Sequence, residues 1–466
     1  MEVPDLREIR RVHLIGIGGA GMNGVARLLM ARGIEVRGSD LKDSKGLEDL
    51  RAAGATVFVG HSPGQLGGPV GGAAPDAVVV SSAIPERNAE LVAARDRGIL
   101  VLARAQVLAA LAGGRRTLAV SGTHGKTTTT SMLAVILERA GLDPTFVIGG
   151  DLNEIGSGAR HGEGDVFAAE ADESDGSFLL LRPEVAVITN VDVDHVDFYA
   201  GGRAEIESAF ARFAEQSVNV VACGDDEGAR RALSLAGREA VTYGVEPGNA
   251  ARLSIVKADR SETRGSLFTD GGETVDLRLR VGGVHNLLNA SAAVLSASLV
   301  GVEPEAAAEG VGTFSGVRRR FEHRGAAGGA DFYDDYAHHP TEVTATLAAS
   351  RDGGRRLVAV FQPHRYTRTQ ALWRELGESL SEADLVVVTD VYGAGEEPIP
   401  GVSGKLLVDA LAVARPGKRL VYLPRRSDVV GFLAREVREG DLVLTLGAGD
   451  ITTIADEALE RIGRAS

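Results

Sequence analysis

Short apolar segments alternate with segments of helical periodicity along most of this chain. The segments that we expect to be strands are Val12–Ile17, Ala77–Ser81, Thr117–Val120, Val166–Ala169, Val185–Thr189, Leu357–Phe361, Leu385–Thr389, Leu420–Leu423 and Leu442–Leu446. Strands that alternate with helices form βα units around parallel sheets. The pattern therefore predicts an α/β protein. Residues 241–281 differ, because their Thr, Val and Gly-Gly pattern is typical of antiparallel strands.

Two loop-like stretches interrupt this pattern and suggest domain boundaries. Residues 112–116 (AGGRR) precede a predicted strand, and residues 316–320 (GVRRR) are followed by the glycine-rich residues 325–329. Cutting there gives three segments of ordinary domain size, 1–113, 114–320 and 321–466.

Composition narrows the classes of function. The chain has 466 residues, with 50 Lys and Arg against 64 Asp and Glu, and a formal net charge of −14. This balance argues against nucleic acid as a partner. The single cysteine excludes an internal disulfide and a cysteine-based metal site. No apolar run approaches the ~18 residues of a membrane span, so we expect a cytoplasmic protein without a membrane partner. A separate expectation is that it is a monomer or weak homodimer.

A first glycine-rich loop follows the strand at Val12–Ile17 and precedes a helical pattern. Gly16, Gly18 and Gly21 match G-x-G-x-x-G, with Gly19 between them, and Asp40 closes the next predicted strand. Such a loop lets a diphosphate approach the backbone at a helix N-terminus, and the acid binds a ribose. The loop by itself fits NAD, another nucleotide diphosphate, or a tight turn that binds no ligand. A nicotinamide-dependent oxidoreductase is therefore one candidate.

A second loop has the composition of a phosphate-binding loop. It reads Gly122-Thr123-His124-Gly125-Lys126-Thr127, with Thr128 next, and it is a shortened form of G-x-x-x-x-G-K-T. In such loops the backbone cradles phosphates, the lysine reaches the β- and γ-oxygens, and the threonine hydroxyl holds Mg²⁺. This loop favours ATP over a pure dehydrogenase. A protein that hydrolyses ATP without ligating anything remains an alternative.

Acidic and histidine residues follow the next two predicted strands. Glu170 comes first after Val166–Ala169, and it is placed to reach a Mg²⁺ held by Thr127. Of the other acids in residues 170–175 (EADESD), we expect some to be ordinary solvent-exposed residues of a loop. His195 follows the strand at Val185–Thr189. Since Mg²⁺ prefers oxygen ligands, the residues alone favour a surface or core histidine there.

Further polar clusters stand at expected helix starts. Asn286 and Asn289 are three residues apart before a predicted helix at Ala290–Val300, where they suit either an adenine edge or an ordinary helix start. In the third segment, residues 334–340 (DDYAHHP) and 361–368 (FQPHRYTR) each follow a strand. Arg365 and Arg368 could form a fork for one carboxylate.

Taken in order, these motifs resemble the Mur ligases, ATP-dependent amide ligases of peptidoglycan precursor synthesis. The resemblance runs from about residue 12 to residue 454. Its motifs are IGIGGAGM at 15–22, SGTHGKTTTT at 121–130, EADESD at 170–175, TNVDVDH at 189–195, HNLLN at 285–289, RRF at 319–321, DDYAHHPTE at 334–342, QPHRYTRT at 362–369, and DVY with EEPIPGVSG within 390–404. Departures from the family pattern are Ala337, where glycine is common, and Asp192-Val193.

The resemblance implies a fold, a reaction and a site. We expect Rossmann-like first and third domains and a central domain similar to P-loop ATPases. The first domain would bind the UDP part of UDP-N-acetylmuramate rather than NAD, the central domain ATP and Mg²⁺, and the third domain an amino acid. Here the amino acid is expected to be L-alanine, because the chain lacks lysine between Lys126 and Lys257, where later-acting relatives carry a carbamylated one. The resemblance places Glu170 and His195 at metal positions. It implies UDP-sugar contacts at the first loop, Asp40, Ser81 and Ser82, ATP contacts at Asn286, Asn289, Arg320 and Asp335, and substrate contacts at Tyr336, His364, Arg365 and Arg368.

Overall fold

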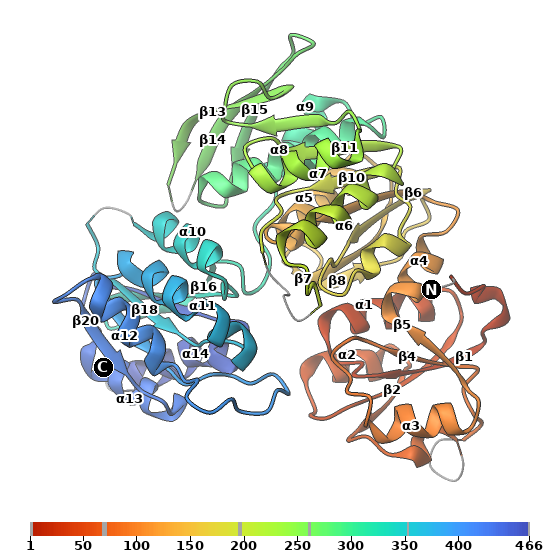
Figure 1. Ribbon diagram of the computed structural model, residues 1–466, viewed down its shortest axis with the longest axis horizontal. Helices are drawn as coiled ribbons and strands as arrows, with labels where there is room; N and C mark the ends of the chain where they lie inside the picture. Colours follow the sequence, from red (N-terminus) through yellow and green to blue (C-terminus); the bar gives the residue numbers. More distant parts are fainter. Residues whose placement is uncertain (1–2, 68–71, 194–197, 260–261, 352–353, 465–466) are drawn as a thin grey trace. The chain divides into compact units, whose positions relative to one another are not determined.

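The computed structural model describes residues 3–67, 72–193, 198–259, 262–351 and 354–464 (Figure 1). The fold is α/β and contains three sheets, as the alternating pattern predicts. The chain forms two compact units. The first comprises Met1–Ser254, Gly265–Arg278 and Leu288–Phe314, and the second Ile255–Arg264, Leu279–Leu287 and Ser315–Ser466. The domain bounds at residues 113 and 320 stay a prediction.

The first domain is built on a five-stranded parallel sheet of order β3-β2-β1-β4-β5. Its strands are β1 (Arg11–Ile15), β2 (Glu35–Asp40), β3 (Thr56–Val59), β4 (Ala77–Val80) and β5 (Leu100–Ala103). Its helices are α1 (Ala20–Ala31), α2 (Lys45–Ala52), α3 (Ala89–Asp96) and α4 (Arg104–Ala112). Because β1 and β4 are parallel neighbours, the loops that follow them meet at one edge of the sheet.

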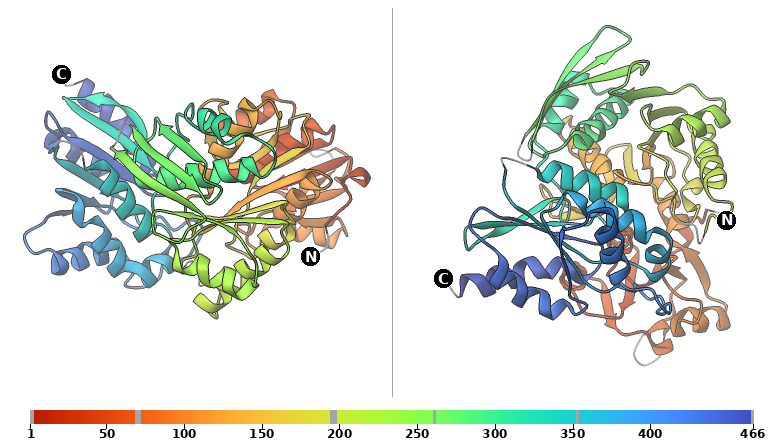
Figure 2. Two further views of the ribbon diagram at one scale, coloured as in Figure 1. Left: turned by 90° about the horizontal axis from the view of Figure 1, so that it is seen from above. Right: turned by 60° about the vertical axis from the view of Figure 1, so that its left-hand side comes forward.

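The middle domain contains a ten-stranded sheet of order β15-β14-β13-β12-β11-β10-β6-β9-β7-β8. The strands are β6 (Arg116–Ser121), β7 (Thr145–Leu152), β8 (Ser157–Arg160), β9 (Val166–Glu170), β10 (Val185–Ile188), β11 (Asn219–Cys223), β12 (Val241–Gly244), β13 (Ala251–Ala258), β14 (Thr263–Thr269) and β15 (Thr274–Leu279). The helices are α5 (Lys126–Arg139), α6 (Arg203–Glu215), α7 (Glu227–Ala236), α8 (Val284–Ser298) and α9 (Pro304–Val311). Figure 2 shows β13, β14 and β15 grouped together.

Two expectations for this domain need correction. An antiparallel arrangement is wrong for β12, which pairs in parallel with both β11 and β13. The reason is α7, because a helical crossover between β11 and β12 returns the chain in the same direction. The helix expected at Ala290–Val300 begins earlier, at Val284, so that Asn286 and Asn289 lie inside α8.

The third domain has a six-stranded sheet of order β16-β17-β21-β18-β19-β20. Its strands are β16 (Glu322–Ala327), β17 (Ala330–Asp335), β18 (Leu357–Phe361), β19 (Leu385–Val388), β20 (Arg419–Tyr422) and β21 (Leu442–Leu446), and only the β16–β17 pair among these described strands is antiparallel. The helices are α10 (Pro340–Ser350), α11 (Tyr366–Ser379), α12 (Lys405–Ala414), α13 (Arg426–Glu436) and α14 (Thr453–Gly463).

Side chains of β18 show why helices cover both faces of this third sheet. Val358 and Val360 join one hydrophobic cluster with α13 and α14, whereas Leu357, Ala359 and Phe361 join another with α10, α11 and α12. Successive strand residues point to opposite faces, so a continuously apolar strand needs a core on each side. The same reasoning explains the apolar runs that the sequence pattern identified.

Close packing joins the first two sheets within one compact unit. Helix α1 packs against β7 and β8, and a single hydrophobic cluster extends from the first sheet into the second. Gly24 makes the approach possible, because a Cβ atom there would lie 3.2 Å from both Ala159 and Val147. Among the described residues, no helix combines the length and apolar character needed to span a membrane.

A buried carboxylate accepts two backbone hydrogen bonds near the start of the third domain. Asp335, at the end of β17, accepts hydrogen bonds from the backbone N–H of Phe321 at 2.8 Å and of Ala337 at 2.7 Å. Burial raises the pKa of Asp335 to about 6, and the nearby Arg320 opposes this rise only in part. An acid whose pKa is raised on folding keeps its proton at pH values where the unfolded chain has released it.

We therefore expect the stabilising contribution of Asp335 to fall as the pH rises from about 4 to about 6. The change should be on the order of 3 kcal/mol, because the pKa of Asp335 rises from its ordinary value of about 4 to about 6. Denaturant titrations of the parent and of Asp335→Asn, followed by fluorescence of the single tryptophan, Trp373, measure the difference in unfolding free energy. The neighbouring Asp331→Asn is the control with the opposite slope, because Arg355 and His323 outweigh burial and lower the pKa of Asp331. A parent–variant difference that stays constant from pH 4 to 7 for Asp335→Asn contradicts this account.

Candidate functional site: two glycine loops and a cluster in the third domain

The loop between β6 and α5 depends on glycine at two positions. Gly122 has φ +139°, and a Cβ atom there would lie 2.1 Å from the Thr189 hydroxyl oxygen. Gly125, with φ +83°, caps α5 in the left-handed region, and a Cβ atom there would lie 2.7 Å from Oδ1 of Asn289. Any larger residue would strain the backbone and displace its neighbours. The sequence motif thus corresponds to a tight strand-to-helix turn that leads into the N-terminus of α5.

Lys126 is the cation at the centre of this loop. Its largely buried ammonium group donates hydrogen bonds to the Gly122 carbonyl oxygen at 2.6 Å and to Oε1 of Glu173 at 2.9 Å. Burial alone would lower the pKa of Lys126, but Glu173, Asp172 and Glu170 reverse the effect and raise it. Lys126 is therefore held as a cation. The sequence did not single out Glu173, because a buried acid within residues 170–175 looks the same as a solvated one.

Thr127 and Glu170 lie together, as predicted. The Thr127 hydroxyl donates to Oε2 of Glu170 at 3.0 Å, and the same oxygen accepts the Gly149 N–H at 2.8 Å. The structure thus brings together two side-chain oxygens, one from the first turn of α5 and one from the end of β9, the strand next to β6. Oxygen donors of this kind suit Mg²⁺. His195, the third predicted metal ligand, lies outside the described residues.

The segment after β10 forms hydrogen bonds with the loop between β6 and α5. The His124 N–H donates to Oδ1 of Asn190 at 2.8 Å, and the Asp192 N–H donates to the Thr123 hydroxyl at 2.8 Å. Strand β10 is the parallel neighbour of β6, so both loops emerge at the same edge. Thr128 follows in the first turn of α5. Asn190 is a residue that the motif analysis did not select.

The first glycine loop turns at Gly16, which has φ +77°. The Gly18 N–H donates to Oδ2 of Asp40 at 2.9 Å, so the predicted ribose-binding acid also supports the loop itself. Gly19 precedes α1, so the helix N-terminus has no side-chain acceptor from its capping residue. Ser81 and Ser82 lie in the turn that follows the neighbouring strand β4. The structure brings these segments to one edge, as the sequence analysis expects.

In the third domain, polar and aromatic side chains gather after β17, β18 and β19. The guanidinium groups of Arg319 and Arg320 lie 4.9 Å and 5.2 Å from the centre of the Tyr336 ring. The Tyr336 ring contacts His338, which in turn contacts His364 with ring centres 5.7 Å apart. Burial, together with His338 and Arg368, lowers the pKa of His364 to about 3. His364 is therefore neutral near pH 7.

Arg365 has a structural partner that the sequence analysis did not identify. Its Nε donates to Oε1 of Glu396 at 2.6 Å, and the other oxygen of Glu396 accepts the Thr367 N–H at 3.0 Å. Arg365 itself has φ +69°, a conformation that costs a non-glycine residue energy. Glu396 thus fixes the loop that leads into α11, whose first turn carries Arg368. The shared-carboxylate fork stays a prediction.

The two asparagines of α8 have defined surroundings. Asn286 donates from Nδ2 to the Gly282 carbonyl oxygen at 2.7 Å. The side chain of Asn289 is buried and lies next to Gly125, at the start of α5. The structure therefore brings Asn289 to the phosphate-type loop, and it ties Asn286 to its own helix start. A role of either residue toward adenine is still a prediction.

Comparisons with known proteins place this site in a family. Three family models match in order: "Mur ligase family, catalytic domain" at residues 11–116, "Mur ligase middle domain" at 120–297 and "Mur ligase, glutamate ligase domain" at 319–449. The chain is similar to a UDP-N-acetylmuramate–L-alanine ligase of Kineococcus radiotolerans, with 48% identity over 98% of this chain and 97% of that one. A relative of the same name from Nitratidesulfovibrio vulgaris is 45% identical over 96% of this chain and 98% of its own length.

Solved structures show the same relationship. The UDP-N-acetylmuramate–alanine ligase of Thermotoga maritima is similar with a TM-score of 0.84 and 29% identity, over 98% of this chain and 100% of that one. A murein peptide ligase from Psychrobacter arcticus is similar with a TM-score of 0.73 and 25% identity, over 97% and 99% of the two chains. The matches follow one another along almost the entire sequence and include all three sheets. The chain therefore belongs to the Mur ligase family.

Proposed function

We propose that this protein joins L-alanine to the lactyl carboxylate of UDP-N-acetylmuramate at the expense of ATP, in peptidoglycan precursor synthesis. The observation that carries the proposal is the loop at Gly122–Thr127, whose lysine is held as a buried cation beside carboxylates. The first glycine-rich loop leads into α1 in the same compact unit. Relatives that cover nearly the whole chain carry the name of this ligase. We further propose a cytoplasmic monomer or weak homodimer.

The chemistry assigns a clear task to Lys126. An oxygen of the substrate carboxylate attacks the γ-phosphorus of ATP, ADP leaves, and an acyl phosphate forms. Lys126 stabilises the negative charge on the transferring phosphoryl group. The amine of L-alanine then attacks the acyl carbon, and the tetrahedral intermediate collapses to the amide with release of phosphate. The protein contributes mainly positioning and exclusion of water, because an acyl phosphate hydrolyses readily.

Thr127 and Glu170 are the described residues that would hold Mg²⁺. Their side-chain oxygens are 3.0 Å apart and come from the start of α5 and the end of β9. The resemblance adds His195 to this set. A bound Mg²⁺ would supply charge neutralisation on the phosphate oxygens. The donor set fits a hard cation, because the two described ligands are oxygen atoms.

The first loop is assigned to the UDP part of the acceptor substrate. The N–H groups at the start of α1 suit a diphosphate, and Asp40 stands at the end of the adjacent strand β2. Ser81 and Ser82 join the same edge through the neighbouring strand β4. These features suit a nucleotide diphosphate sugar, which has no nicotinamide, and they suit a dinucleotide equally well. The phosphate-type loop in the same unit favours the former.

The remaining assignments concern ATP and the amino acid. Asn286, Asn289, Arg320 and Asp335 are proposed to contact ATP, with Asn289 already placed beside Gly125. Tyr336, His364, Arg365 and Arg368 are proposed to contact the amino acid. A neutral His364 can donate or accept a hydrogen bond without adding charge to the positive Arg365 and Arg368.

The test of the function is a phosphate-release assay with UDP-N-acetylmuramate and ATP against a panel of amino acids. We expect release that requires the sugar nucleotide and is fastest with L-alanine. Phosphate release independent of the sugar nucleotide and the amino acid would favour a simple ATPase. Binding of NAD(P)H without ATPase activity would favour an oxidoreductase.

Replacing the loop lysine separates the two nucleotide sites. Lys126→Ala should abolish ligation and leave the affinity for UDP-N-acetylmuramate nearly intact, because the sugar-nucleotide site lies at α1. Calorimetric titration measures that affinity, and phosphate release measures turnover. Loss of sugar-nucleotide affinity as severe as the loss of turnover contradicts the two-site assignment.

Stability requires a control here, because Lys126→Ala leaves Glu173 buried without its lysine. Removal of one member of a buried ion pair costs about 3–5 kcal/mol. The double variant Lys126→Met with Glu173→Gln removes both charges, and it should regain stability without regaining ligation. Thermal unfolding of the single and double variants checks this.

Removal of the Glu170 charge should weaken the response to Mg²⁺. Glu170→Gln keeps the size of the side chain, and we expect the Mg²⁺ concentration for half-maximal phosphate release to rise at least tenfold, roughly the effect of losing one ligand contact of ~1.4 kcal/mol. Glu138→Gln, which removes a charge paired with Arg160 elsewhere in this domain, is the matched control. An unchanged Mg²⁺ response in Glu170→Gln would exclude Glu170 as a ligand.

Lysine substitutions of the third-domain arginines test selection of the amino acid. Arg365→Lys and Arg368→Lys should each lower kcat/KM for L-alanine roughly 10- to 150-fold, because a charge-assisted hydrogen bond contributes about 1.5–3 kcal/mol. The constants for ATP and UDP-N-acetylmuramate should change much less. Arg374→Lys on the same helix, where the guanidinium stacks on Trp373, is the control. If both variants shift the ATP constant and leave the L-alanine constant alone, the arginines belong to the phosphate site.

A further inference from the structure

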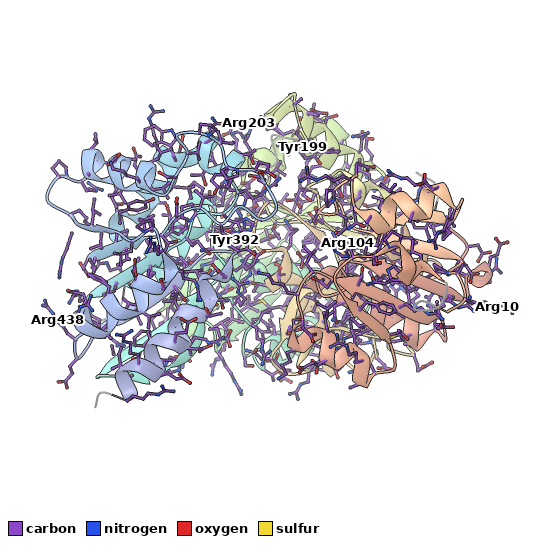
Figure 3. All side chains as sticks on the ribbon, turned by 90° about the horizontal axis from the view of Figure 1, so that it is seen from below. Arg10, Arg104, Tyr199, Arg203, Tyr392 and Arg438 are labelled. Carbon is purple, nitrogen blue, oxygen red and sulfur yellow. The ribbon has the colours of Figure 1, made fainter. Side chains whose placement is uncertain are left out.

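Arg104 is placed against the first glycine loop. It is the first residue of α4, directly after β5, and Figure 3 labels it at the margin of the first domain. Its Nη1 atom lies only 2.2 Å from the position that a Cβ atom on Gly21 would occupy. The guanidinium therefore fills the space that the last glycine of the motif leaves open. Glycine at position 21 thus makes room for the Arg104 side chain.

The other arm of the same guanidinium reaches the acidic segment of the middle domain. Nη2 of Arg104 donates to Oδ2 of Asp172 at 3.1 Å, and Oδ1 of Asp172 accepts the Ser174 N–H at 3.1 Å. Burial would raise the pKa of Asp172, but Lys126 and Arg104 outweigh it and hold the pKa at about 2. Asp172 is thus a fixed anion with two cationic neighbours: Lys126 follows the second glycine-rich loop, and Arg104 lies against Gly21 of the first.

The N-terminus of α1 has unfilled donor capacity next to this cation. Gly19 offers no side-chain acceptor, and the first turn of α1 contains no acidic residue. The Gly18 N–H donates to Asp40 and the Gly19 N–H to the Gly16 carbonyl oxygen, so the relevant donors are the N–H groups of the first turn of α1, from Ala20 onward. A helix N-terminus beside a guanidinium is a site for a phosphate group, because dipole, amides and charge act in the same direction.

We propose that Arg104 binds the diphosphate of the acceptor nucleotide at the first loop, with Asp172 as the residue that positions it. The inference rests on the proposed function, because it takes the substrate to be a UDP-linked sugar. Nη2 stays on Asp172 while Nη1 faces the diphosphate across Gly21. One side chain thereby sets how far the acceptor lies from the loop that carries Lys126.

Titration calorimetry on the full-length protein tests this assignment. The ligands are UDP-N-acetylmuramate, UDP and ATP, and the variants are Arg104→Gln, Arg104→Lys and Arg27→Gln. Arg27 lies farther along α1, where its Nε donates to Asn23, and its replacement removes one positive charge from the same domain. The ATP titration and thermal unfolding show whether each variant is folded.

We expect Arg104→Gln to bind UDP-N-acetylmuramate and UDP roughly 10- to 150-fold more weakly than the parent, the loss typical of a charge-assisted hydrogen bond. ATP affinity should change less than threefold. Arg104→Lys should retain part of the affinity because it keeps the charge without the planar fork. Arg27→Gln should bind like the parent.

Two results overturn the proposal, and they are distinguishable from failure of the proposed function. If Arg104→Gln binds UDP as tightly as the parent, even with a lowered unfolding temperature, Arg104 has only a structural role through its hydrogen bond with Asp172. If Arg104→Gln and Arg27→Gln weaken UDP binding equally, the effect comes from the net charge of the domain and not from a contact of Arg104 with the diphosphate. A parent protein that binds ATP but neither UDP ligand instead overturns the substrate assignment and the inference with it.

Discussion

A buried ammonium group has to be paired, and this constraint organises the middle domain. Lys126 lies largely out of water at the start of α5, and the described acids around it keep it charged. Taking a charge out of water costs several kcal/mol unless partners compensate for it. Glu173, Asp172 and Glu170 supply that compensation from the segment after β9. The loop, the strand and the acidic segment therefore form one electrostatic unit.

Parallel strands bring the partners of this unit together. Strand β6 lies between β9 and β10, so that the loops after all three strands emerge at one edge. Thr127, Glu170 and Asn190 come from these three loops, although long stretches of chain separate them. The first and third domains use the same principle, with the first glycine loop beside Ser81 and the Tyr336 segment beside His364. Each sheet thus has polar loops gathered at one of its edges.

The sequence predicted much of this arrangement because its signals are local. The strands Leu357–Phe361 and Leu442–Leu446 occur at their predicted bounds, and both glycine loops join a strand to a helix. Glycine and lysine at fixed spacing encode a turn whose geometry needs no distant partner. The closeness of Thr127 and Glu170 was predicted correctly, because Glu170 ends β9 and Thr127 starts the helix after the neighbouring strand β6.

Other features depend on contacts between distant segments and left no comparable signal. Glu173 and Asp172 are neighbours in an acidic run, yet one pairs with Lys126 and the other with Arg104. Glu396 pairs with Arg365, 31 residues away along the chain, with α11 and β19 between them, and spacing carries no information at that separation. The parallel pairing of β12 was missed because a Thr- and Val-rich strand has the same pattern in either direction. Domain bounds and the roles toward ATP and the amino acid stay predictions.

The central claim is that the protein activates a carboxylate by phosphorylation, and an isotope measurement tests it most directly. UDP-N-acetylmuramate with ¹⁸O in its lactyl carboxylate is ligated to L-alanine with unlabelled ATP, and the released phosphate is analysed by mass spectrometry. The account predicts that each released phosphate carries one oxygen from the carboxylate, because the acyl–oxygen bond breaks when the amine attacks. Phosphate that contains no ¹⁸O, while the amide still forms, would contradict it.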